Sequence, residues 1–294
     1  MTYQRRKFIK LSAALGAGVV LQSMSTGLLG CNTAKNASGT QGIGPFGLQL
    51  YTLRDDLTKD PKGVLKQVSQ FGYKQLEGYE GPQGLFWNMT PAAFKSYLDS
   101  LGMTMVSSHC DYTKDFERKA EQAASIGMKY LLCPYLGPQK SLDDYKRAAD
   151  KFNQCGEISK KAGIRFGYHN HDYSFTKQEG VYPQDIMMQQ TDKNLVDFEM
   201  DIYWVVTAGE DPIKWLEKYP NRFKLFHIKD RKKNTTEKAD SVVLGTGIID
   251  FPAIMRAANK QGSNYFIVEQ EKYEGTTPLL AAKADAMYMK NLKL

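Results

Sequence analysis

The chain has 294 residues, with 39 lysines and arginines, 32 aspartates and glutamates, and four histidines. Its formal charge of +7 comes partly from the first 30 residues, which hold four basic side chains and no acidic one. The rest carries only +3, so charge gives no reason to expect nucleic-acid binding.

The N-terminus has the features of an export signal. Arg5 and Arg6 form a twin-arginine pattern, and an uncharged apolar run follows over 11–29. The run ends in the sequence LLGC at Cys31, which resembles the lipobox of bacterial lipoproteins. We expect 1–30 to be a signal peptide removed after export, with a lipid on Cys31 anchoring the protein in the periplasm or at the cell surface. The alternative is an uncleaved membrane anchor, because the run is just long enough to span a bilayer.

The segment after the signal and the remaining cysteines suit an exported protein. Residues 31–44 are small, polar and glycine-rich, which is typical of a flexible tether. After the lipobox cysteine, only Cys110, Cys133 and Cys155 remain. An odd number argues against a complete disulfide framework, and all three lie in segments with the pattern of a core. We therefore predict buried free thiols.

From residue 46 onward, short apolar runs alternate with longer amphipathic ones. The short runs predict eight strands, at 46–53, 73–79, 103–109, 129–136, 164–171, 195–201, 222–228 and 264–270. The longer runs predict helices, as in 60–72, 91–102, 115–127 and 143–163. Several of the helical patterns end in a glycine, which helix C-termini favour: Gly72, Gly102, Gly127, Gly163 and Gly262.

The alternation of strand and helix predicts an α/β protein with parallel strands. Eight units in about 250 residues fit a closed (β/α)8 TIM barrel better than an open doubly wound sheet. No G-x-G-x-x-G motif follows the first strand, which weakens the dinucleotide-binding alternative. We predict one TIM barrel over 45–294.

Histidines and acidic residues gather at the C-terminal ends of the predicted strands, where such barrels build their active sites. The residues concerned are His109, His169, His171, Asp201, His227 and Glu269. Side chains two apart share a strand face, so both histidines of the fifth strand should point into the barrel mouth. Asp201, His227 and Glu269 end three consecutive strands. We expect them to share one divalent cation: Mn²⁺, Zn²⁺, Co²⁺ or Mg²⁺.

Five short motifs resemble the xylose isomerase-like barrel superfamily, which includes sugar isomerases and epimerases. They are GYHNHDY (167–173), FEMDIYW (198–204), FHIKD (226–230), LGTGIIDF (244–251) and IVEQE (267–271). The resemblance extends over the whole predicted barrel, in order and in strand placement. It implies a metal-dependent enzyme acting on a sugar.

The resemblance also implies roles for individual residues. The epimerases hold their metal with Glu, Asp, His and Glu on strands five to eight, and Asp201, His227 and Glu269 match the last three. His169 stands in place of the first glutamate, and Ser174 occupies a position where some relatives have Glu. His169 is therefore a fourth ligand or a general base, and Glu269 is a ligand that also serves as a base.

Further residues are candidates for substrate contact: Glu77, His109, His171, Trp204 and Tyr51. Each has a structural alternative: a rim carboxylate for Glu77, a core histidine for His109, and packing for the aromatic residues. Lys229 could stabilise an enolate or pair with Asp230 or Glu271. The Gly245 and Gly247 loop could bind phosphate, but a plain turn is the favoured interpretation.

Three functions fit these residues. The leading hypothesis is a metal-dependent isomerase or epimerase of a non-phosphorylated sugar or keto-sugar, which deprotonates the carbon beside a carbonyl. The second is a lyase or hydrolase acting on a 3-keto-glycoside by the same enolate chemistry. The third is a sugar-binding lipoprotein without catalysis. The expected partners are a small sugar and, through the lipid alone, a membrane; an oligomer is possible.

Overall fold

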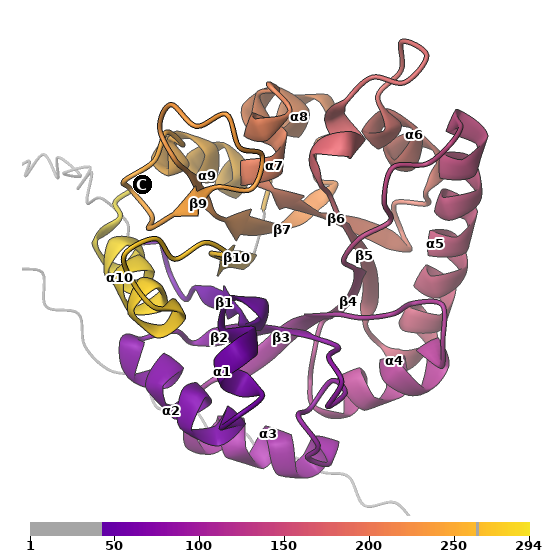
Figure 1. Cartoon of the computed structure of the whole chain (residues 1–294). Helices are drawn as coiled ribbons and strands as arrows, with labels where there is room; N and C mark the ends of the chain where they lie inside the picture. The colour runs from indigo at the N-terminus through magenta and orange to yellow at the C-terminus, as the bar shows by residue number, and fades with distance from the viewer. Residues whose placement is uncertain (1–42, 263–264) are drawn as a thin grey trace, which may run out of the picture. The chain divides into compact units, whose positions relative to one another are not determined.

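The computed structural model describes residues 43–262 and 265–294. The predicted signal over 1–30, Cys31 and most of the predicted tether lie outside the described residues. Eight parallel strands close into a barrel in the order β1-β10-β7-β6-β5-β4-β3-β2, with helices around it (Figure 1). The predicted TIM barrel is confirmed.

All eight predicted strands are present, and each is shorter than predicted. They are β1 (Gly47–Gln49), β2 (Gln75–Tyr79), β3 (Thr104–His109), β4 (Tyr130–Cys133), β5 (Arg165–His169), β6 (Val196–Asp201), β7 (Phe223–Ile228) and β10 (Tyr265–Val268). The first prediction extended too far because 3-10 helix η1 (Leu50–Leu53) follows directly, and the Gln49 side chain accepts a hydrogen bond from its Tyr51 amide. The fifth extended too far because the chain leaves the sheet after His169, so His171 lies in the loop before 3-10 helix η2 (Asp172–Phe175).

One small sheet was not predicted. Strands β8 (Asp230–Arg231) and β9 (Ser241–Val242) pair antiparallel between β7 and α9. Each has only two residues, which is too short for a period-2 pattern to be recognisable. The pair holds the loop over residues 232–240 at the barrel mouth.

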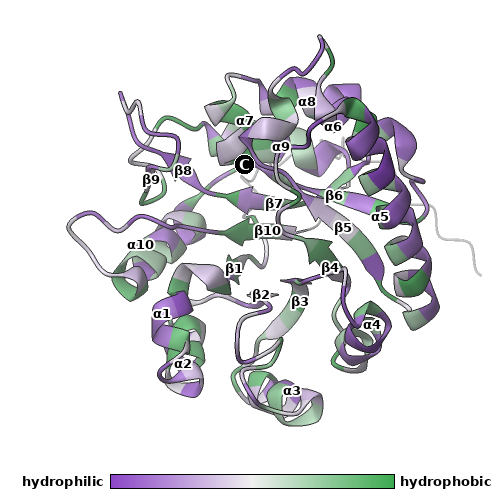
Figure 2. Ribbon diagram, turned by 45° about the vertical axis from the view of Figure 1, so that its right-hand side comes forward, coloured by the Kyte–Doolittle hydropathy of each residue, from purple (hydrophilic) through white to green (hydrophobic). Residues whose placement is uncertain are grey.

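Five of the helices end one or two residues before a glycine predicted to end them. The helices are α1 (Arg54–Leu57), α2 (Pro61–Phe71), α3 (Pro91–Ser100), α4 (Phe116–Ser125), α5 (Leu142–Ala162), α6 (Pro183–Gln190), α7 (Ile202–Thr207), α8 (Pro212–Lys218), α9 (Phe251–Lys260) and α10 (Pro278–Asn291). The five predicted helix-ending glycines all adopt positive φ, which glycine tolerates best. Figure 2 shows hydrophilic and hydrophobic residues alternating along the helices, as expected where one face covers a barrel. No helix in the described ranges is both long and apolar enough to cross a bilayer.

The barrel interior has an apolar floor beneath a polar mouth. Tyr130, Leu132 and Leu225 form a small buried cluster, with Tyr265 packed against it. Gly167 makes room for this floor, because a Cβ there would lie 2.9 Å from Cδ2 of Leu132. The polar residues described below lie at the opposite, C-terminal ends of the strands. The three predicted thiols pack outside this interior cluster and are free and buried, as predicted.

Candidate functional site

A pocket of about 380 Å³ opens at the C-terminal ends of the strands. This volume lies within the usual range for small-molecule sites. Six residues singled out from the sequence line it: Tyr51, His109, His169, His171, Trp204 and Glu269. The sequence therefore located the pocket correctly, on the face where barrels of this kind bind their ligands.

Below the pocket, Glu77 belongs to a fully buried network. Its Oε1 accepts hydrogen bonds from Nε2 of His227 at 2.6 Å and from the amide of Gln49 at 2.8 Å. Because the side chain has no exposed surface, the alternative of a rim carboxylate is wrong. Glu77 supports the site from beneath and does not line the pocket.

Glu199, which the sequence analysis did not place in the site, joins two of its histidines. His109 Nε2 and His169 Nδ1 both lie 2.9 Å from the same oxygen, Oε2 of Glu199. Glu199 is fully buried, and its other oxygen has no hydrogen-bond partner among the described residues. His109 is thus part of the polar cluster rather than a solitary core histidine.

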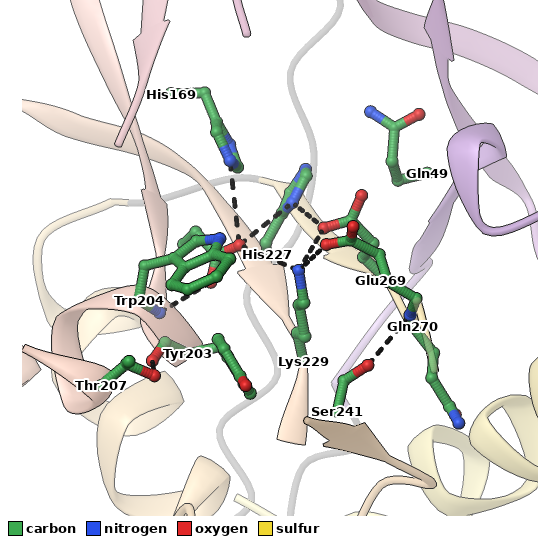
Figure 3. Close-up of polar contacts among 12 residues, drawn as sticks. Gln49, His169, Tyr203, Trp204, Thr207, His227, Lys229, Ser241, Glu269 and Gln270 are labelled. Atoms are coloured by element: carbon green, nitrogen blue, oxygen red, sulfur yellow. Dashed lines mark hydrogen bonds and ion pairs between the residues drawn. The ribbon is translucent and has the colours of Figure 1, made fainter. Parts of the chain in front are cut away.

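Asp201, His227 and Glu269 converge as predicted. One possible ligand atom from each lies within 4.8 Å of the others. Nδ1 of His227 is 3.2 Å from Glu269 Oε2 (Figure 3). It is 3.8 Å from Asp201 Oδ2, and Nε2 of His169 is also 3.8 Å from Asp201 Oδ2. Asp201 Oδ1 caps α7 by accepting from the Trp204 amide, whereas its buried Oδ2 has no hydrogen-bond partner within the described ranges.

Two buried carboxylates set the orientation of the histidine rings. Since a carboxylate accepts, Nδ1 of His169 donates to Glu199 and Nε2 of His227 donates to Glu77. The other nitrogen of His169, Nε2, then carries a lone pair and lies 3.8 Å from Asp201 Oδ2. Nδ1 of His227 lies nearer Glu269 Oε2, at 3.2 Å, and is hydrogen-bonded to it. Carboxylate–histidine pairs of this kind are a common arrangement behind metal-binding histidines.

Lys229 pairs with carboxylates at the mouth. Its ammonium donates to Glu269 Oε2 at 3.2 Å and to Glu271, and lies 3.9 Å from Asp201 Oδ2. Of the two ion pairs weighed from the sequence, the one with Glu271 is present. The Lys229 ammonium also lies 5.1 Å from the centre of the Trp204 ring.

The glycine-containing loop before α9 binds a carboxylate of its own chain. The Asp230 side chain accepts hydrogen bonds from the amides of Gly245, Gly247 and Ile249. Amides arranged in this way could hold an anion such as phosphate. Here Asp230 occupies them, so the interpretation as a structural turn is confirmed.

Negative charge predominates at the site. Four buried carboxylates and the partly exposed Glu271 surround three histidines and one lysine; the buried four are Glu77, Glu199, Asp201 and Glu269. Buried carboxylates are costly unless a cation or hydrogen bonds compensate them. The partnerless oxygens of three of these side chains show that hydrogen bonding is incomplete.

The pKa values of the two acids on β6 reflect this crowding. Burial and the nearby Glu77 carboxylate raise the pKa of Glu199 to about 7. Burial also raises the pKa of Asp201 to about 6, although Lys229 and His227 oppose the shift. Both carboxylates are thus destabilised as anions when no cation is bound.

The histidines respond in opposite directions. Burial, with the positive charges of His227 and His109, lowers the pKa of His169 well below its ordinary value, which keeps the ring neutral. Burial also opposes charge on His227, but Glu199 and Glu269 raise its pKa well above the ordinary value. A second proton on His227 would place a positive charge beside the Glu199 and Glu269 carboxylates. A bound metal ion would compensate the same negative charge.

The spacing of these atoms fits a divalent cation. Ligands about 2.1 Å from a tetrahedral ion lie roughly 3.4 Å apart. The separations quoted above are 3.2 Å for His227 and Glu269, 3.8 Å for His227 and Asp201, and 3.8 Å for His169 and Asp201. The ligand atoms of Asp201, His227 and Glu269 all lie within 4.8 Å of one another, and His169 adjoins this group through Asp201. The donor set of two imidazoles and two carboxylates suits Zn²⁺, Mn²⁺ or Co²⁺.

Comparison with known proteins identifies the family. A family model described as "Xylose isomerase-like TIM barrel" matches residues 65–292. The chain belongs to this family. The resemblance found in the motifs is therefore confirmed, and the protein is an enzyme of the xylose isomerase-like group.

Its relatives carry out related but different reactions. An inosose dehydratase of Clostridium perfringens is 31% identical over 145 residues, covering 44% of this chain and 48% of that protein. The chain thus spans about half the length of the first curated relatives it matches. A solved sugar phosphate isomerase/epimerase of Parabacteroides distasonis is 32% identical, with a TM-score of 0.71 over 86% of this chain and 95% of that one.

A third relative was crystallised with a metal. The protein IolI, solved with a bound zinc atom, has a TM-score of 0.66, is 16% identical and covers 83% of this chain and 95% of its own. At this identity the likeness shows the fold alone. The suitability of the present site for a metal therefore rests on its own side chains.

Proposed function

We propose that the protein is a divalent-metal-dependent isomerase or epimerase of a non-phosphorylated sugar or keto-sugar. One observation carries the proposal: two imidazoles held by buried carboxylates meet Asp201 Oδ2, which has no hydrogen-bond partner among the described residues, at the base of a pocket of about 380 Å³. Imidazoles that are oriented by carboxylates in this way are typical of metal ligands.

In this proposal, Asp201, His227, Glu269 and His169 hold the metal. His169 acts as a ligand, because its Nδ1 is committed to Glu199 and only Nε2 remains available. A bound divalent cation supplies Lewis acidity, which polarises the substrate carbonyl and makes the adjacent C–H more acidic. The ion itself is taken to be one of the four named from the sequence.

The chain supplies the proton transfers. Glu269 takes the proton from the carbon beside the carbonyl, and the electrons of that C–H bond become the enediolate double bond. Lys229, within hydrogen-bond distance of Glu269, donates to the developing oxyanion. Returning the proton from Glu269 to the neighbouring carbon gives isomerisation, whereas epimerisation needs a second acid that protonates the opposite face of the same carbon.

The filled amide loop before α9 supports a substrate without phosphate. Asp230 already accepts from three amides that could otherwise bind a phosphoryl group. A negatively charged substrate would also meet the acidic cluster at the mouth.

Elimination is the second candidate, because its first step, removal of the proton beside the carbonyl, would be the same. A relative named inosose dehydratase removes water, and loss of a hydroxyl or of a glycosidic oxygen from the enediolate is the alternative to reprotonation. The presence of His169 where the epimerases have a glutamate favours this alternative, since it removes one of the two glutamates on which their inversion depends.

The test is proton exchange in D₂O. Metal-loaded protein should incorporate deuterium beside the carbonyl of an unphosphorylated keto-sugar, and NMR should show an isomer, an inverted epimer or a released leaving group. Glu269→Gln should abolish exchange while weakening metal binding only partly. Glu274→Gln is the matched control, since Glu274 is exposed and pairs with Lys232 outside the pocket. A protein with neither stoichiometric metal nor exchange would instead be a sugar-binding protein.

His169→Ala separates the two roles of this histidine. As a ligand, its loss should empty the metal site. If the variant kept full metal occupancy but lost activity, His169 would be the base, which typically contributes about 10²–10⁴-fold to the rate. Full occupancy with full activity would exclude His169 from the site.

A further inference from the structure

A second pocket adjoins the one at the barrel mouth. It has a volume of about 390 Å³ and shares with the first pocket three aromatic residues, which we call the ridge: Tyr135, His171 and Trp204. Its other lining residues come from the loop after β4, from the η2 region and from the loop between β8 and β9: Pro138, Asp172, Tyr173, Thr176 and Lys238. The two pockets are thus neighbours that share these three residues as a wall.

The ridge is held rigidly. The His171 ring stacks between Tyr173, at 5.8 Å and 6°, and Trp204, at 5.3 Å and 28°. Tyr135 meets the same ring edge-on at 4.9 Å and 85°. The Tyr173 hydroxyl accepts hydrogen bonds from the amides of Leu136 and Gly137, which fixes the loop that carries Tyr135. The ring positions are therefore organised before any ligand arrives, which reduces the entropic cost of binding.

The ridge also has a surface available to a ligand. Tyr135 is 58% exposed, although it packs on two other aromatic rings. An exposed aromatic ring suits the apolar face of a sugar ring, whose edge is polar.

The far side of the second pocket is polar. Lys238 Nζ lies 2.5 Å from Asp172 Oδ2, which joins the loop between β8 and β9 to η2 across the pocket. The Thr176 hydroxyl donates to the Asp172 carbonyl at 3.1 Å. Lys238 is largely exposed and can donate to a ligand as well as to Asp172. Paired donors and acceptors of this kind bind hydroxyl groups.

The ridge connects directly to the proposed reaction centre. Trp204 contacts His171 on the ridge and also lies 5.1 Å from the Lys229 ammonium, which donates to Glu269 (Figure 3). A ligand in the mouth pocket therefore lies one aromatic ring away from the second pocket.

We propose that the substrate is a glycoside of two sugar rings that fills both pockets. The ring that reacts lies in the mouth pocket, and the second ring crosses the ridge and is bound by Lys238 and Asp172. This inference rests on the proposed function for which ring reacts, but the existence of the second subsite does not depend on catalysis.

The experiment is calorimetric titration with unreactive probes, both with and without Mn²⁺. Cellobiose, maltose and lactose are compared with glucose and galactose, and phenyl β-glucoside supplies an aromatic aglycone. At least one disaccharide should bind about tenfold or more tightly than its component monosaccharides. Lys238→Ala should reduce this ratio several-fold, because it removes a charged donor. The matched control is Lys232→Ala, which removes a lysine of the same loop that pairs with Glu274 outside both pockets.

The outcomes separate this inference from the proposed function. If no disaccharide binds more tightly than its component monosaccharides, the second subsite is refuted, whatever the proton-exchange assay shows. If phenyl β-glucoside binds most tightly and Lys238→Ala leaves the ratios unchanged, the assignment of a second sugar ring is wrong. A disaccharide preference that persists without metal or exchange would support the subsite and count against the proposed reaction.

Discussion

Replacing Asp201 with asparagine tests metal binding separately from folding. The Asn side-chain oxygen can still accept from the Trp204 amide and cap α7, as Oδ1 of Asp201 does at 3.2 Å. The other oxygen, Oδ2, has no hydrogen-bond partner among the described residues, and the substitution replaces it with an NH₂ group, which cannot be a metal ligand. We therefore expect Asp201→Asn to fold and to lose most of its affinity for the metal.

The size of the effect follows from linkage. A cation at a thousand times its Kd stabilises the folded state by about 4 kcal/mol. For a barrel of this size, each kcal/mol moves the melting temperature by roughly 2–4 °C, so the wild type should gain roughly 8–16 °C with metal. In EDTA the variant should instead be more stable than the wild type. The wild type buries Asp201 Oδ2 without a hydrogen-bond partner, which costs about 1–3 kcal/mol.

The assay is thermal unfolding of both proteins in EDTA and across a titration of Mn²⁺ or Zn²⁺, with bound metal measured by mass spectrometry. Asp211→Asn is the matched control, since Asp211 caps α8 in the same way but is exposed. It should gain as much stability from the metal as the wild type does. An equally large metal-dependent gain in Asp201→Asn would refute the ligand role of Asp201 and the site built around it.

Three further predictions concern pH, packing and location. Burial raises the pKa of Asp285 to about 7 from 3.8, so the folded state favours its protonated form. The free energy of unfolding of the wild type should therefore fall as pH rises from about 4 to 7, by at most about 4 kcal/mol. Asp285→Asn should make this free energy, measured by chemical denaturation, depend less on pH over that range. An unchanged pH dependence in the variant would contradict the prediction. Gly247→Ala should destabilise the fold by about 1–3 kcal/mol in the same assay, because its Cβ would overlap Asp230 and the Arg231 carbonyl; a neutral effect would show that this loop can move. We also propose that Cys31 is lipidated after export by the twin-arginine route: Cys31→Ser should release the protein from the membrane fraction, whereas continued retention would support an uncleaved anchor.

The sequence by itself determined the architecture and the edge that carries the chemistry. The alternation of short and long apolar runs predicted eight strands, and the helix-ending glycines separated the helices from them. Both signals are local, because they depend on the periodicity of burial and on the φ that a single residue tolerates. Strand parity likewise brought Asp201, His227 and Glu269 together, since the ends of consecutive parallel strands converge in a closed barrel.

The tertiary structure decided which residues support that edge and how. Glu199 has the same strand parity as Asp201, but only the folded barrel brings it to two histidines from β3 and β5. Glu77 was predicted to contact the substrate, with a rim carboxylate as the alternative, but it is fully buried beneath the pocket. Burial depends on all neighbouring strands rather than on position within one strand. Tyr135 gave no signal, since its exposure depends on the loop that Tyr173 holds from another part of the chain. Contacts between distant segments fix the orientation of each imidazole and the join between the two pockets, and no local pattern in the sequence encodes them.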